Sequence, residues 1–292
     1  MKNYGLNLDL EQQHRSEKDW VYGALSQPCL ASIPSGERKK YLPRGEVQKG
    51  VDDMMDCASR DPVNLLETKF NFLVRNKRIL SENVQWLRDN GYIVIYETED
   101  GPLEAVEFSD AFIAINSGTT RAGNSLIAPI DAIHTCGLIP KKDLPLVATM
   151  TFDEYHDPNR ITARMINMGK EFLRRFPINY ERVNEVHFGD VLKDDMIASA
   201  GYAWPDPVDG EYQRTDMIPN HAFLVFDLPK FNIFDNYFDV LDGDFVKKLA
   251  ADYDLVDFGY RVIISTEKVP QSTGLVKTFW KRVLKYLYEI IR

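Results

Sequence analysis

Residues 54–67 read MMDCASRDPVNLLE, in which a lone cysteine precedes a proline and the start of an apolar helical pattern. Asp61 is a favourable N-cap, and Pro62 suits the first helical position. The apolar residues that recur at helical spacing are Val63, Leu66, Phe70 and Leu73. This pattern predicts a helix that begins at Cys57 or only at Pro62 and that buries one face.

Cys57 has two interpretations on the sequence alone. A small buried thiol at a helix start is the usual role of a cysteine. Alternatively, the amides at the head of a helix stabilise a thiolate, which makes a cysteine there a nucleophile. Asp56 acts against the second interpretation, because a neighbouring carboxylate raises a thiol pKa unless it points away.

Working outward from this stretch, helical patterns dominate the chain before Pro177, and strand patterns follow it. Helices are expected over 81–91, the later part of 118–137, 161–176 and 190–201. Strands are expected over 92–97, 221–228, 231–238 and 260–265, with a turn at 101–105 and an amphipathic piece at 245–253. Helices first and strands later is the order of an α+β protein rather than of a doubly wound sheet.

Composition excludes several classes of function. The 292 residues carry a net charge of −9 and are 44% hydrophobic, which is ordinary globular usage without the basic face that nucleic-acid binding needs. No signal peptide or apolar span is present, so we expect a soluble protein that is cytoplasmic at synthesis. The three cysteines, Cys29, Cys57 and Cys136, form neither a disulfide framework nor a zinc motif, and no metal or organic cofactor is implied.

Two further groups complete a set that could activate a thiol. His221 opens the strand pattern HAFLVFD, where its ring can project into a cleft. Asp235 shares one face with Phe231 and Ile233 in the next strand, so it could orient the imidazole; the competing interpretation is a turn aspartate. His14, His156 and His187 lie in polar or turn surroundings. His134 lies on a helix near Cys136, but a spacing of two puts these residues on different faces.

The order cysteine, histidine, Asx, with helices before strands, resembles the papain-like cysteine peptidases, and it is similar to the divergent type in tailed bacteriophage genomes. The resemblance covers about residues 45–265. It implies Cys57 as nucleophile, His221 as general base and Asp235 as the group that orients it, or Asn236 if the register shifts by one. Gln48 is then the candidate for the oxyanion hole, and residues 117–145 look like the family's glycine-rich substrate strap and the segment after it.

The same resemblance implies a papain-like α+β fold: a helical subdomain (45–177) followed by a small, antiparallel, β-barrel-like subdomain (178–268). Residues 1–44 carry turn signals and few periodic apolar positions, so we expect an N-terminal arm laid over a later core. Residues 269–292 form an amphipathic helix with five basic residues against one acidic residue from position 274 on.

Two functions remain open. One is a thiol peptidase that acts on a peptide or protein through a thioacyl-enzyme. The other is a catalytically silent papain-like structural or interaction protein, for instance a virion component. Residues 274–292 could pack on the protein's own acidic body, self-associate, bind a virion partner or lie on an anionic membrane.

Overall fold

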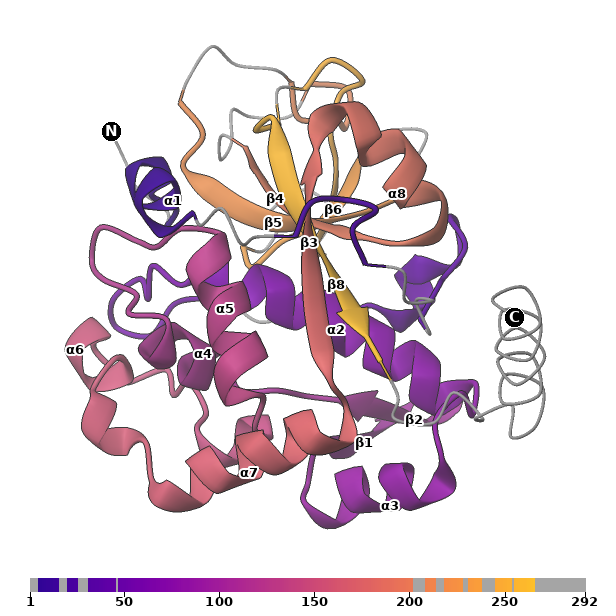
Figure 1. Ribbon diagram of the computed structural model, residues 1–292, viewed down its shortest axis with the longest axis vertical. Coiled ribbons are helices and arrows are strands. Elements are labelled where there is room, and N and C mark those ends of the chain that lie inside the picture. The colour runs from indigo at the N-terminus through magenta and orange to yellow at the C-terminus, as the bar shows by residue number, and fades with distance from the viewer. Residues whose placement is uncertain are drawn as a thin grey trace, which may run out of the picture.

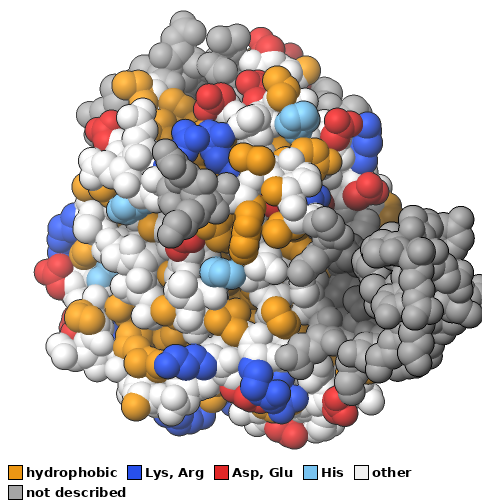
Figure 2. Space-filling model, in the orientation of Figure 1, with side chains coloured by type: hydrophobic (Ala, Val, Ile, Leu, Met, Phe, Trp, Pro, Cys, Tyr) orange, Lys and Arg blue, Asp and Glu red, His pale blue; other side chains and the backbone are white. Residues whose placement is uncertain are grey.

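The computed structural model describes residues 5–15, 20–25, 31–45, 47–201, 208–213, 218–227, 231–237, 245–253 and 255–265. Cys29 and the amphipathic helix expected over 269–292 lie outside these residues. Among the described helices, none is long and apolar enough to cross a membrane. On the face shown in Figure 2, Lys and Arg side chains lie in small separate groups among acidic ones.

The first part of the chain is mostly helical (Figure 1). Its α-helices are α1 (Leu8–His14), α2 (Cys57–Arg75), α3 (Ser81–Asp89), α4 (Asp110–Asn116), α5 (Ile127–Cys136), α6 (Phe152–Tyr155) and α7 (Ala163–Arg175). Between α3 and α4, β1 (Ile93–Thr98) and β2 (Gly101–Val106) form an antiparallel pair. The turn expected over 101–105 is therefore wrong, because those residues pair with β1 and the turn lies just before them.

The second part is one antiparallel sheet with the strand order β3-β8-β4-β5-β6-β7. Its elements are β3 (Ile178–Asn184), α8 (Phe188–Asp194), β4 (Ile197–Gly201), β5 (His221–Asp227), β6 (Asn232–Phe234), β7 (Val246–Lys248) and β8 (Phe258–Ile264). Within the described residues β3 does not pair with β7, so the sheet is open and the barrel-like expectation is corrected. The helix expected over 190–201 ends at Asp194, and β4 takes its second half.

Helix α2 lies between the sheet and helices α4 and α5, in contact with β4 and β5 on one side and with α4 and α5 on the other (Figure 1). It begins at Cys57, so Asp61 is not its N-cap, and Pro62 lies inside it. Every residue from Cys57 to Val74 is buried, whereas one buried face was expected. A helix enclosed on both sides must also satisfy its polar residues internally, as Lys69 does with Asp195 at 2.7 Å.

The N-terminal arm lies along this body. Arg38 is fully buried and donates to the carbonyls of Ile33, Leu192 and Phe226 at 2.7–2.8 Å. These bonds tie the segment that precedes α2 to α8 and β5. Helix α1 lies beside α5 (Figure 1). The arm therefore contacts both the helical part and the sheet.

Candidate active site

Cys57 is the first residue of α2, and its side chain has no exposed area. The backbone N–H of Ala222 donates to Cys57 Sγ at 3.4 Å, which holds the sulfur beside the start of β5. The N–H groups of the first helical turn have no intrahelical partners and carry partial positive charge. Cys57 therefore meets the positional requirement for an activated thiol. Cys136, at the end of α5, is half-buried and lies within 3.9 Å of Asn116.

His221 and Asp235 lie together on the sheet. His221 Nε2 and Asp235 Oδ1 are 2.6 Å apart, and both side chains are fully buried. Burial raises the pKa of Asp235, but the charges of His221 and Lys247 outweigh it and hold that pKa below its usual value. An ionised carboxylate only accepts hydrogen bonds, so Nε2 of His221 donates to Asp235, and Nδ1 is the ring nitrogen left to exchange a proton with another group.

Asn236 has a different partner. Its Oδ1 accepts a bond from Asn64 Nδ2 of α2 at 3.0 Å, while its backbone N–H donates to Asp235 Oδ1 at 2.6 Å. Between these two residues it is Asp235 that contacts His221. The structure therefore does not have the one-residue shift of register that would bring Asn236 to His221.

Gln48 is buried and joins the same group of side chains. Its Nε2 donates to Asp53 Oδ1 at 3.0 Å and to the Tyr237 hydroxyl at 2.9 Å. The Tyr237 ring lies 5.3 Å from the His221 ring, centroid to centroid, and its hydroxyl also donates to Asp53. Gln48 is thus linked to the histidine through Tyr237, and both hydrogens of its amide are engaged.

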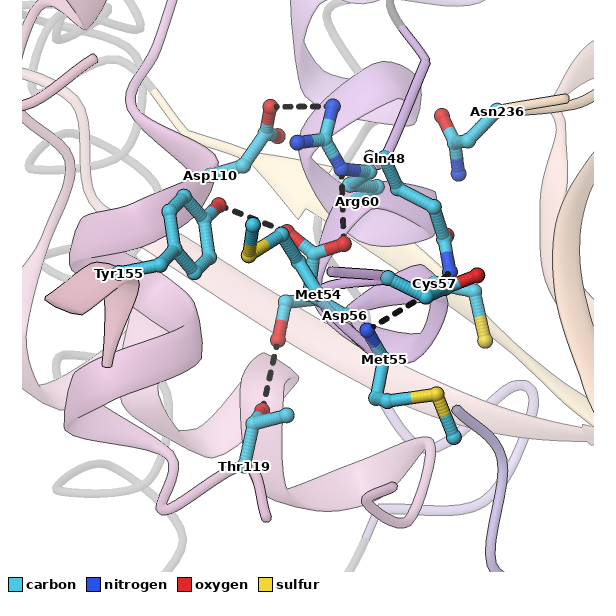
Figure 3. A network of polar contacts seen from close by, with 12 residues as sticks. Gln48, Met54, Met55, Asp56, Cys57, Arg60, Asp110, Thr119, Tyr155 and Asn236 are labelled. Atoms are coloured by element: carbon cyan, nitrogen blue, oxygen red, sulfur yellow. Dashed lines mark hydrogen bonds and ion pairs between the residues drawn. The ribbon is translucent and has the colours of Figure 1, made fainter. Parts of the chain in front are cut away.

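The carboxylate of Asp56, next to the cysteine, points away into a buried polar network (Figure 3). Its Oδ1 accepts from Arg60 Nε at 2.9 Å, and its Oδ2 accepts from the Tyr155 hydroxyl at 2.7 Å. Arg60 also pairs with Asp110 at 3.1 Å. Both oxygens of Asp56 are therefore satisfied by α2 and α6 rather than by the thiol.

Burial raises the pKa of the Cys57 thiol well above its ordinary value, and the bond from Ala222 offsets this only in part. The negative charges of Asp56, Asp53 and Asp235 raise it further. The thiol is therefore neutral in this structure at neutral pH. A thiolate requires either a transfer of its proton to a nearby base or a more open site.

Residues 5–7 of the N-terminal arm lie across this region. Asn124 N–H donates to the Gly5 carbonyl at 2.9 Å, and Asn7 N–H donates to the Asn124 carbonyl at 2.8 Å, so Leu6 and Asn124 form a parallel bridge. Leu6 N–H also donates to the carbonyl of Asn220 at 3.4 Å, one residue before the histidine. The Leu6 side chain belongs to the same buried apolar cluster as Cys57.

Close packing fixes the position of this segment. Gly5 has φ +108°, and a Cβ there would lie 2.5 Å from the backbone carbonyl carbon of Met55. A Cβ on Gly123 would in turn lie 2.4 Å from the backbone of Gly5. Glycine is needed at both positions because the backbones approach so closely. The arm thus fills the space between the segment before Cys57 and the segment before α5.

Helix α1 anchors the same arm through Glu11, which is buried. One carboxylate oxygen accepts from the N–H groups of Leu126 and Ile127 at 2.7 and 3.2 Å, and the other accepts from the Tyr260 hydroxyl at 2.6 Å. Glu11 therefore caps the start of α5 from another part of the chain, while the adjacent Ser125 hydroxyl accepts from the N–H of Ala128 at 3.1 Å. His14 Nδ1 adds a contact with the Ser125 hydroxyl at 2.8 Å.

No protein-family model and no curated protein matches this sequence. Solved structures do match it: xylellain, a cysteine protease from Xylella fastidiosa, has a TM-score of 0.51 at 15% identity and covers 91% of this chain and 96% of its own. The fold is papain-like. The cysteine protease Amb a 11 of ragweed pollen, in its proform, gives a TM-score of 0.51 at 12% identity, over 91% of this chain and 76% of its own.

At these identities the papain-like likeness concerns the fold and does not extend to the site residues. Sequence reasoning missed the Lys247 contact with Asp235, and it left open the orientation of Asp56 and the place that the arm covers. The pair Lys247 and Lys248 between Val246 and Leu249 was the available signal for the first, because strand alternation turns one of two adjacent side chains inward. The other two depend on contacts across about a hundred residues of chain.

Proposed function

We propose that this chain is a thiol peptidase of the papain-like type that hydrolyses peptide bonds of a peptide or protein. One observation carries the proposal: Cys57 Sγ accepts a hydrogen bond from the second residue of the strand whose first residue, His221, is bonded to an ionised Asp235. Helix head, base and orienting carboxylate are the three requirements of a cysteine nucleophile.

In the proposed reaction, His221 Nδ1 takes the proton of Cys57, and the thiolate attacks the peptide carbonyl carbon. The backbone N–H of Cys57 stabilises the oxyanion, together with the Gln48 amide after it exchanges one of its present partners. The imidazolium then protonates the leaving amine, and water hydrolyses the thioacyl-enzyme. Asp235 keeps the ring oriented throughout.

The backbone of Asn124 supports a peptide as the substrate. Its N–H and C=O pair with residues 5–7 of the arm, so they can pair with an extended peptide in the same way. The arm and a substrate would use the same groups. The proposed activity therefore requires the arm to leave this position.

The test compares the chain with the Cys57→Ala variant on a peptide library, with and without removal of residues 1–15. Hydrolysis that requires Cys57 supports the proposal, and an epoxide reagent should label Cys57 once the arm is removed. The proposal is wrong if the arm-deleted chain stays folded, labels at Cys136 and leaves Cys57 unlabelled.

The full burial of Cys57 and its raised pKa favour one alternative, a catalytically silent papain-like structural or interaction protein, for instance in a bacteriophage virion. This alternative predicts the unlabelled result above. A loss of peptide hydrolysis in Cys57→Ala excludes it.

A further inference from the structure

Lys247 lies in the interior beside the group that orients the histidine. Its side chain is 2% exposed, and its Nζ contacts Asp235 Oδ2 and donates to the Tyr237 carbonyl at 2.6 Å. The Tyr212 ring lies 5.9 Å from the same Nζ, within the range of a cation–π contact. A buried lysine in such contacts requires an explanation, because lysine is seldom buried without a partner.

The pairing of β6 with β7 explains how the chain brings Lys247 there. Lys247 pairs directly with Ile233, and paired residues share one face of a sheet. Asp235 follows two residues after Ile233 and lies on that face too. Lys248, the next residue, points the other way and is exposed.

The two oxygens of Asp235 have different partners. Oδ1 contacts His221 and the backbone N–H of Asn236, while Oδ2 contacts Lys247. The charge of Lys247 thus compensates the charge of Asp235 on the side away from the ring. A carboxylate with a paired cation presents a hydrogen-bond acceptor to the imidazole without a net negative charge.

Other charged or titratable groups near this pair come from α2 and from the segment before it. Cys57 and the buried Asp61 lie on α2, and each is electrostatically coupled to Asp235. Asp53, in the segment before α2, reaches the same region through Tyr237. These groups add negative charge or none, so among the described residues Lys247 is the cation that balances Asp235 besides the histidine itself.

We propose that Lys247 is a positioning residue of the candidate site, which balances the charge of Asp235 and so limits the effect of that charge on the His221 ring. This inference rests on the proposed function for its catalytic meaning. Its physical content, the charge balance at His221, holds whether or not the chain turns over a substrate.

A double-mutant cycle tests this. In Lys247→Met, the unbalanced Asp235 charge should move the His221 titration midpoint, measured by NMR on the full chain, upward by about one pH unit or more. In Asp235→Asn, the unbalanced Lys247 charge should move it downward. The variant with both changes removes both charges and should return to within about half a unit of the unmodified protein.

Matched variants isolate the charge. Lys247→Arg keeps it and should keep the midpoint, and Lys248→Met removes an exposed charge on the same strand and should change nothing. If Lys247→Met does not fold, the comparison of Asp235→Asn with the double variant still gives the sign. Midpoints that do not differ between those two variants overturn the inference.

Peptide hydrolysis by the same proteins, measured with the arm removed, separates the two proposals. If the His221 midpoints shift in opposite directions in the single variants and return in the double variant, but no hydrolysis depends on Cys57, the charge balance is upheld and the peptidase proposal is refuted. Hydrolysis with unshifted midpoints refutes the role of Lys247 and upholds the peptidase. In an active chain, the pH profile of hydrolysis should move with the midpoint.

Discussion

Substitution of Glu11 by alanine should expose Cys57 without any change at the cysteine itself. Glu11 accepts three hydrogen bonds that hold α1 against α5 and β8. Bonds to a charged group contribute about 1.5–3 kcal/mol each, but the released carboxylate regains its hydration, and burial raises the pKa of Glu11. We therefore take about 1 kcal/mol as the net contribution of each hydrogen bond to the docking of the arm.

The three bonds together stabilise the docked arm by about 3 kcal/mol on this basis, and their loss should increase the open fraction roughly 100-fold. Leu6 and the backbone bonds to Asn124 remain, so the arm stays mostly docked in Glu11→Ala. If the arm opens and closes faster than the thiol reacts, the rate of Cys57 alkylation follows the open fraction.

The assay is alkylation by iodoacetamide, with the modified Cys57 peptide quantified by mass spectrometry over time. Asp9→Ala is the matched control, because Asp9 is an exposed acid on the same short helix. Cys136 serves as an internal reference for general loosening. Equal rates for Cys57 in Glu11→Ala and Asp9→Ala would refute the reasoning, as would a parallel acceleration of Cys136.

Stability measurements test the buried charges. Arg60→Met removes the cation that contacts both Asp56 and Asp110 and should lower the unfolding free energy, measured in urea, by about 3–5 kcal/mol. Tyr155→Phe removes one hydrogen bond and should lower it by about 1–2 kcal/mol, and similar losses in the two variants would contradict this network. Burial, with the Asp235 charge, raises the pKa of Asp61, and the Ser199 backbone offsets this only in part. The native state thus keeps a proton that the unfolded chain releases, so the contribution of Asp61 to stability falls as pH rises from about 4 through its folded pKa. Asp61→Asn removes this dependence on pH, so the melting temperature of the variant minus that of the unmodified protein should increase between pH 4 and pH 8. A difference that stays constant over this range would contradict the raised pKa of Asp61.

The sequence identified the central helix but not where it begins. The apolar spacing of Val63, Leu66, Phe70 and Leu73 is visible in the sequence because it depends on residues within one helix. Asp61 and Pro62 formed a plausible start, yet Asp61 is buried in the helix. Tertiary packing on the sheet outweighs the local preference for a cap, which no local pattern reveals.

The parts of the candidate site that depend on the alternation of side chains within one strand were predictable. The parts that depend on which strands pair with each other were not. The two-residue alternation of side chains along a strand was enough to put Asp235 on the same face as Ile233. Lys247 stayed hidden because 245–253 has an amphipathic pattern, and only the pairing of β7 with β6 turns its side chain inward. Glu11 and Tyr155 act on partners about a hundred residues away, a distance that sequence periodicity does not cover.

The acidic surroundings of Cys57 bear on how a thiolate could form there. Asp56 is balanced by Arg60, and Asp235 by Lys247, yet these carboxylates and Asp53 still raise the thiol pKa. Ionisation of the thiol alone would add another negative charge to a buried acidic site, which is unfavourable. A thiolate is stable there only if its proton stays close by as positive charge on an imidazole. If Cys57 is the nucleophile, it must therefore react as a thiolate–imidazolium pair with His221, and the charge of Asp235 and Lys247 decides at which pH that pair exists.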